Sequence, residues 1–93
     1  MDTLRFDGRI RYWNPDKPGG LAVADIPAEH VRAFGGLRQQ RVRGSIAGVD
    51  FASNVMPAGG GRLAMSVSKA MMKAAGVDIG DDVEFAITEI GRD

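Results

Sequence analysis

The sequence predicts a mainly β fold, a small six-stranded barrel capped by two short α-helices, in a single domain that spans residues 1–93. Three observations predict it. Short segments of alternating apolar and polar residues recur along the chain, as in strands with one buried face. Glycine- and proline-rich breaks separate these segments. Two segments carry helix start and stop signals, and both are short enough to cover the ends of a barrel.

The first part of the chain predicts two strands joined by a loop. Apolar and charged residues alternate from Leu4 to Tyr12, which is the pattern of a strand with one face in the core. Asn14-Pro15-Asp16 and Pro18-Gly19-Gly20 favour a loop, because proline and glycine interrupt regular structure. Residues 21–26 then predict a second strand.

Residues 27–36 predict the first short helix. Pro27 suits the first position of a helix, where its missing N–H costs nothing. Gly35-Gly36 ends the helix after about two turns. At this spacing, Val31 and Phe34 are expected to face inward and to help close one end of the barrel.

The middle of the chain predicts a β-hairpin. Val42 to Gly48 and Val49 to Met56 form its two strands. Ala47-Gly48 forms the turn, because glycine accepts the positive φ that a tight turn requires. Pro57 and the Gly59-Gly60-Gly61 run are expected to break the chain before the next strand.

The last third predicts a strand, a helix and a strand. Residues 63–67 alternate as in a fifth strand. Ser68 suits the N-cap of a helix, and Gly76 suits the left-handed residue after its end, with Val77 as the apolar residue that follows a Schellman ending. Residues 83–87 predict the sixth strand.

A weak internal repeat accompanies this order. Residues 6–10 resemble residues 42–46, and each segment is followed by a strand, a short helix and a glycine, at residues 20–35 and 61–76. Either two similar half-barrels close on each other within one chain, or the short strands resemble one another by chance. The first interpretation permits a monomer, and the second requires two chains to close the barrel.

The composition excludes several kinds of functional site. The chain has no cysteine, which excludes disulfides, thiolate catalysis and sulfur-ligated metal sites. Its single histidine, His30, cannot form a paired-imidazole metal site, so no cofactor or metal is expected. The net charge of zero gives little long-range attraction for nucleic acid. No apolar segment is long enough for a membrane helix, and a cytoplasmic location is expected.

The chain resembles a known family in its joint order of glycines, prolines and flanking residues. The motif residues are Gly8, Gly44, Gly48, Pro57, Lys69, Gly76, Gly80 and Asp81. On these residues the chain is similar to the bacterial domain-of-unknown-function family nineteen-oh-five, whose members occur alone or joined to a YdeI/OmpD-associated domain. The resemblance implies a double-split β-barrel similar to the swapped-hairpin barrels of AbrB and MazE transcription factors, and no established activity.

Two positions depart from the family pattern. Ala47 stands where the hairpin turn commonly carries asparagine, which has little consequence for the fold. Met72 stands where a basic residue is frequent on the second helix, which weakens the case for anion binding on that helix face.

A basic surface is the main candidate site. Arg9, Arg11 and Trp13 share the outer face of the first strand, and Arg41 and Arg43 share a face of the third. If these strands are neighbours, four guanidiniums and an indole converge on a surface suited to an anionic ligand. The alternative is a set of ordinary solvated residues on a sheet.

Other groups have structural explanations. Asp81, next to Asp82 and Glu84, is expected to accept backbone hydrogen bonds in a turn. The segment from Gly59 to Arg62 lacks the Gly-Lys-Ser/Thr ending of a phosphate-binding loop, so a hairpin connection is expected. Met65 is expected in the core, and Met71 or Met72 over a barrel end.

These observations favour a non-catalytic cytoplasmic binding or interaction module whose ligand is unknown. Its expected partner is an anionic ligand or a protein, and a membrane partner is not expected. A DNA-binding regulator of AbrB type is the second interpretation, and a small enzyme is the third. Both a monomer and a homodimer are compatible with the sequence.

Overall fold

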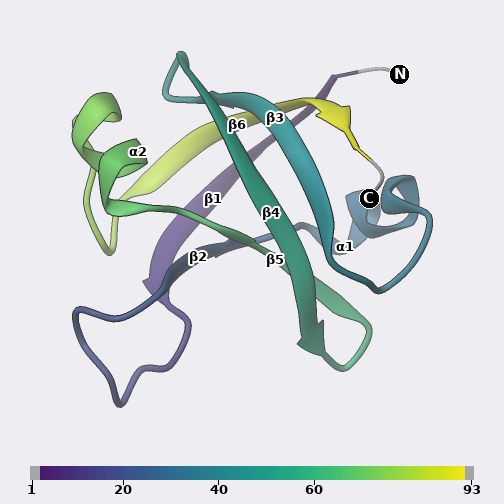
Figure 1. Cartoon of the computed structure of the whole chain (residues 1–93), viewed down its shortest axis with the longest axis horizontal. Helices are drawn as coiled ribbons and strands as arrows, with labels where there is room; N and C mark the ends of the chain where they lie inside the picture. Colours follow the sequence, from purple (N-terminus) through teal and green to yellow (C-terminus); the bar gives the residue numbers. More distant parts are fainter. Residues whose placement is uncertain (1–2, 92–93) are drawn as a thin grey trace.

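A computed structural model describes residues 3–91, and within them six antiparallel strands close into a barrel in the order β1-β2-β5-β4-β3-β6 (Figure 1). This confirms the predicted mainly β barrel with two short helices. The strands are β1 (Leu4–Tyr12), β2 (Ala22–Asp25), β3 (Gln40–Ile46), β4 (Val49–Gly59), β5 (Arg62–Ser66) and β6 (Asp82–Ile90). The helices are α1 (Ala28–Val31), which continues as a 3-10 turn over Arg32–Phe34, and α2 (Lys69–Ala75).

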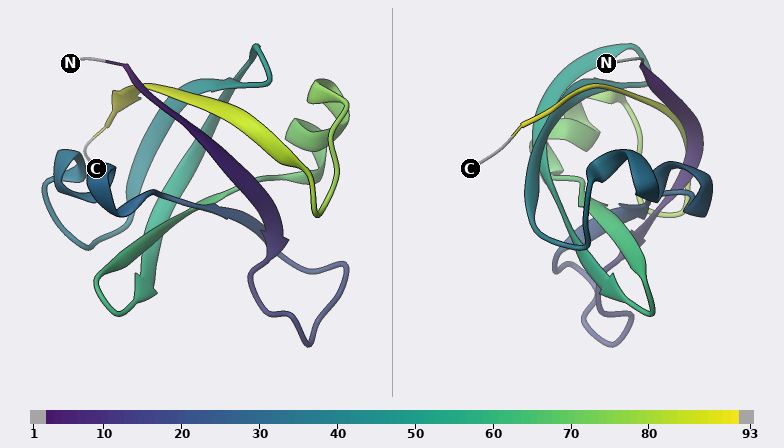
Figure 2. Two further views of the ribbon diagram at one scale, coloured as in Figure 1. Left: turned by 180° about the vertical axis from the view of Figure 1, so that it is seen from behind. Right: turned by 90° about the vertical axis from the view of Figure 1, so that its right-hand side faces the viewer.

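The strand order has an internal two-fold pattern. Exchanging β1, β2 and β3 with β4, β5 and β6 leaves the order of neighbours around the barrel unchanged. Each half is therefore a β-β-α-β unit, and α1 and α2 lie at opposite ends of the barrel (Figures 1 and 2). One chain closes the barrel by itself.

The internal repeat is correct for one pair of segments and wrong for the other. Residues 20–35 and 61–76 each hold a strand and a capping helix, and they occupy equivalent places in the two halves. Residues 6–10 lie in β1 and residues 42–46 in β3, but the strand order makes β1 equivalent to β4 and β3 equivalent to β6. The resemblance between β1 and β3 instead reflects a shared role, since both pair with β6.

The core fills the barrel with aliphatic and aromatic side chains. Phe85 and Phe6 stack with ring centroids 5.4 Å apart. Met65 is fully buried, as predicted, and lies with Ile10 and Ile46 in the same cluster. No helix among residues 3–91 has both the length and the apolar character needed to cross a bilayer.

Two glycines allow strands to approach β6 closely. Gly44 pairs with Ile87 where the β3–β6 register shifts, and a Cβ atom at this position would overlap the Ala86 carbonyl group. Gly8 lies against the ring of Phe85, where an added Cβ would come within 3.1 Å of the ring. These contacts explain why both strands that pair with β6 carry a glycine.

The first helix and Pro57 differ from the prediction. Pro27 has φ −55° and ψ 141°, so it is the extended N-cap and α1 begins one residue later. Pro57 does not break the chain but pairs with Leu63 inside β4, next to a register shift. A proline is tolerated there because it lies beyond Val55, where the pairing of β4 with β3 ends, so its missing N–H breaks no ladder bond. The chain reverses at residues 60–61 instead.

The second helix has the predicted caps. The Ser68 hydroxyl oxygen accepts the backbone N–H of Met71 at 3.1 Å. Gly76 adopts φ 69°, and Val77 N–H donates to the Met72 carbonyl oxygen at 3.0 Å, which is the long bond of a Schellman ending. These caps set the direction in which the chain leaves α2 toward β6.

Candidate functional site

The arginines predicted to converge are spread over the outside of the barrel. β6 lies between β1 and β3, so the two strands that carry the arginines are not neighbours. The predicted five-residue cluster therefore does not form. Its Trp13 lies just beyond β1 with 38% of its surface exposed, and its backbone N–H donates to the Leu21 carbonyl oxygen at 2.7 Å.

Three of these arginines face a carboxylate on a neighbouring strand. Arg11 makes two bonds of 2.8 Å to the Asp25 carboxylate. The other two pairs are Arg9 with Asp82, at 3.2 Å, and Arg43 with Glu89, at 3.8 Å. The hydrogen bonds from Arg11 lower the pKa of Asp25. Because each pair offsets its charges, the outer face of β1 is less attractive to an anion than the arginine count suggests.

The two predicted arginines of β3 line a wide, polar hollow. Arg41 and Arg43 line a depression of about 910 Å³ over β3 and β6, together with Thr88 and Glu89. The Glu89 carboxylate lies beside Arg43 and offsets part of the positive charge of the hollow. Anion binding here stays a prediction, and polar atoms make up a larger share of these walls than apolar atoms do.

The remaining sequence candidates have local contacts. His30 is half-buried on α1, with its ring centroid 6.1 Å from that of Phe6. As predicted, Asp81 takes part in the turn before β6, where its carboxylate accepts the Asp78 N–H at 2.9 Å. Arg62 folds back on the hairpin turn and donates to the Gly59 carbonyl oxygen at 3.2 Å. Residues 3–91 contain no group of three or more His, Asp or Glu side chains placed to hold a metal ion.

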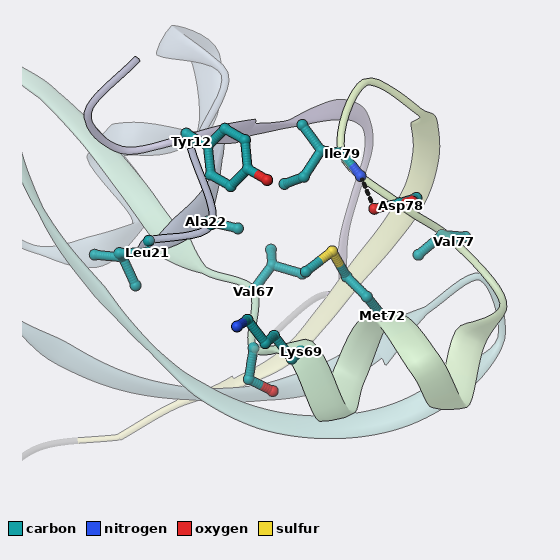
Figure 3. Close-up of a pocket in the computed structure, with 12 residues that line it drawn as sticks. Tyr12, Leu21, Ala22, Val67, Lys69, Met72, Val77, Asp78 and Ile79 are labelled. Atoms are coloured by element: carbon teal, nitrogen blue, oxygen red, sulfur yellow. Dashed lines mark hydrogen bonds between the residues drawn. The ribbon is translucent and has the colours of Figure 1, made fainter. Parts of the chain in front are cut away.

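An apolar groove lies at the barrel end capped by α2, and we call it the α2 groove. It is a half-open hollow of about 540 Å³ between the loop of residues 13–21 and α2 (Figure 3). Residues 77–79, which lead into β6, close its third side. Its main side-chain walls are Tyr12, Leu21, Val67, Met72, Val77 and Ile79.

The α2 groove exists because α2 covers the barrel end incompletely. None of the residues of α2 is fully buried, and Met71, Met72 and Ala75 pack only partly against the core. Met71 and Met72 thus cover a barrel end as predicted. The Met72 sulfur and the Tyr12 hydroxyl point into the hollow from opposite walls (Figure 3).

The polar groups of the α2 groove are few. Tyr12 and Lys69 take part in no side-chain hydrogen bond or ion pair among residues 3–91, apart from bonds made by their backbones. Asp78 also borders the groove, but its carboxylate accepts the Ile79 N–H at 2.7 Å (Figure 3). The Ser68 hydroxyl is used in the helix cap. Lys69 and the Tyr12 hydroxyl are therefore the polar groups open to a ligand.

A second groove occupies the equivalent place in the other half of the barrel, and we call it the α1 groove. It holds about 420 Å³ between α1 and the turn at residues 60–61, with Ile26, Val31 and Arg62 among its walls. Ile26 of the α1 groove and Val67 of the α2 groove occupy equivalent positions, because Ile26 directly follows β2 and Val67 directly follows β5.

The comparison with protein families matches most of the chain to one family model. The family model described as "Domain of unknown function (DUF1905)" matches residues 6–87. The chain belongs to the DUF1905 family. No curated protein matches the DUF1905 chain.

Two of the residues on which the family resemblance rests, Gly80 and Asp81, have contacts that hold the fold together. Gly80 adopts φ 92° and donates its N–H to the Ile10 carbonyl oxygen at 2.7 Å, and the Asp81 carbonyl oxygen accepts the Ile10 N–H at 3.0 Å. These bonds fix the turn before β6 to β1, beside the α2 groove. Of the motif residues, Lys69 is the one whose side chain borders that groove.

The α2 groove was missed in the sequence because its walls come from three separate segments. Tyr12 continues the alternation of β1 and was assigned to the core, but it is half-buried at the end of the barrel. Leu21 was assigned to a strand, yet it precedes β2 and is 47% exposed. A large apolar residue at the junction of a long loop and a strand was the available signal.

Proposed function

We propose that this DUF1905 domain is a non-catalytic binding module whose ligand site is the α2 groove. The observation that carries the proposal is an apolar hollow of about 540 Å³ in which the Lys69 ammonium group and the Tyr12 hydroxyl have no hydrogen-bond or ion-pair partner among residues 3–91. Small-molecule sites typically have volumes of about 300–1,000 Å³, mostly apolar walls and a few polar groups that orient the ligand. The α2 groove has these properties.

A binding role is favoured over catalysis by the groups that line the groove. Among the described residues that line the groove, none is a histidine or a carboxylate without a hydrogen bond, and the Ser68 hydroxyl already accepts the Met71 N–H. Acid-base and nucleophilic catalysis both need a reactive group with a base or acid within hydrogen-bond reach. The groove supplies hydrophobic surface and hydrogen-bond donors instead.

The AbrB-type alternative receives less support from the outer surface. DNA binding draws most of its affinity from unpaired cations that contact phosphates. Arg9, Arg11 and Arg43 each lie beside a carboxylate, which leaves a DNA phosphate to compete for them. The α2 groove therefore gives the better candidate site.

The test uses two exposed leucines. Leu21 borders the α2 groove, and Leu37 lies outside it with a similar exposure of 51%. A library of small aromatic and aliphatic compounds, screened by ¹H–¹⁵N NMR, is expected to shift resonances of residues at the α2 groove. Leu21→Ser removes apolar contact and is expected to lower the affinity for the tightest-binding compound by roughly threefold to tenfold.

Leu37→Ser is the matched control, since it makes the same change to an exposed leucine elsewhere. Its affinity for the same compound is expected to equal that of the unmodified domain. The proposal fails if no compound shifts α2-groove resonances, or if the two serine variants weaken binding equally.

A further inference from the structure

The two free polar groups of the α2 groove are both hydrogen-bond donors. Lys69 is exposed on α2, and Tyr12 reaches the groove from the end of β1 (Figure 3). An ammonium group has three donors and no acceptor, and a phenol hydroxyl can donate one hydrogen bond. A ligand group that only accepts hydrogen bonds suits this pair.

The two charged residues of the α2 groove, Lys69 and Asp78, lie at opposite ends of α2, so an anion can bind beside the lysine. Lys69 has no ion-pair partner among residues 3–91. Asp78, the carboxylate at the groove, lies at the end of α2 away from Lys69 and accepts the Ile79 N–H (Figure 3). Lys69 therefore presents an uncompensated positive charge beside an apolar surface.

We infer that the α2 groove binds a small carboxylic acid with an apolar body. This inference rests on the proposed function and names the ligand class of the same site. The carboxylate accepts hydrogen bonds from Lys69 and the Tyr12 hydroxyl, and such charge-assisted bonds are short and strong. The apolar body lies against Leu21, Val67 and Met72, whose flexible thioether adapts to its shape.

The test compares two probes that differ in charge. The acid 4-phenylbutanoate and the alcohol 4-phenyl-1-butanol have the same apolar body, and only the first is an anion at pH 7. An exposed ion pair contributes about 0.2–1 kcal/mol, so the acid is expected to bind up to about fivefold more tightly than the alcohol. Calorimetry gives the affinities, and NMR shifts locate both probes.

Two lysines of α2 provide the decisive variants. Lys69→Met removes the ammonium group at the groove and is expected to abolish the preference for the acid. Lys73→Met makes the same charge change on an exposed residue of the last turn, outside the groove, and is expected to keep the preference. Tyr12→Phe retains the ring and removes the hydroxyl, so it is expected to weaken acid binding more than alcohol binding, because the bond to the carboxylate is charge-assisted.

The outcomes separate this inference from the proposed function. Equal affinity for both probes, with both weakened by Leu21→Ser, overturns the carboxylate assignment and keeps the groove as the binding site. Failure of both probes to shift the α2-groove resonances overturns both proposals. Two further results also overturn the inference, because they assign the groove to another occupant. One is self-association of the domain through the groove that the acid does not displace. The other is a groove that binds only the C-terminus of a peptide.

Discussion

The two ends of the barrel have the same topology and different surfaces. At the α1 end, the 3-10 turn after the helix inserts Phe34, which is only 2% exposed, into the core. Figure 2, at right, looks onto this end, with α1 lying across the barrel opening. At the α2 end no helix residue is fully buried, and the larger groove remains open.

The connections next to the helices account for much of this difference. The strands beside α1 meet in the two-residue turn Gly60-Gly61, and Arg62 folds back on it. The strands beside α2 are joined by residues 13–21, which form a wall of the α2 groove. A repeated β-β-α-β unit can therefore stabilise the fold at one end and form a binding surface at the other.

The largest expected effect concerns the sealed end. Phe34→Ala leaves a cavity at the α1 end and is expected to lower the free energy of unfolding by about 3–5 kcal/mol. Met72→Ala at the open end removes a half-buried side chain and is expected to cost less than about 2 kcal/mol. Urea denaturation of both variants measures the difference, and equal losses would show that the two ends are sealed alike.

A smaller effect on the free energy of unfolding is expected at two hairpin turns, one at Ala47-Gly48 and one at Gly60-Gly61. Ala47 adopts φ 49° and Gly60 adopts φ 60°, a region that disfavours residues with a Cβ atom. Ala47→Gly is expected to stabilise the domain by up to about 1 kcal/mol, and Gly60→Ala to destabilise it by about 1 kcal/mol. Thermal denaturation shows whether each variant gains or loses stability. A loss of stability in Ala47→Gly would contradict the backbone argument.

The smallest effect is a pH dependence at the strands that lead into the α2 groove. The hydrogen bonds from Arg11 lower the pKa of Asp25 in the folded domain. Their stabilisation is therefore present above the unfolded-state pKa of about 3.9 and is lost as the pH falls through the lower, folded value. Asp25→Asn is expected to remove about 0.2–1 kcal/mol at pH 7 and progressively less as the pH falls toward 2.

The matched control for this pH dependence is Asp82→Asn. Its partner Arg9 is more exposed than Arg11, at 68% against 38%, and the Arg9–Asp82 bond is longer, at 3.2 Å against 2.8 Å. A smaller loss at pH 7 is expected. Unfolding free energies measured from pH 2 to pH 7 would contradict this account if the Asp25→Asn difference did not shrink on acidification.

The fold was predictable because its signals are local. The alternation in β1, the Ser68 cap and the Gly76 ending each depend on neighbouring residues, and all three are present in the structure. The prediction that Pro57 breaks the chain is wrong because its tolerance inside β4 depends on where the pairing with β3 ends, at Val55. The extent of that pairing is a property of two strands, which a local pattern does not contain.

The candidate sites depend on which distant segments meet, so they were less predictable. The arginine cluster required β1 and β3 to be neighbours, and the pairing of β6 with both strands separates them. The α2 groove required Tyr12, Lys69 and Val77 to meet at one end of the barrel. Neither arrangement follows from periodicity along a single segment.

The most direct test of the central claim locates a bound ligand at one of the two ends. Intermolecular nuclear Overhauser effects between 4-phenylbutanoate and the methyl groups of the domain make this measurement. The account predicts contacts from Met72 and Val77 in the α2 groove. Contacts from Ile26 and Val31 in the α1 groove, with none from Met72, would contradict it.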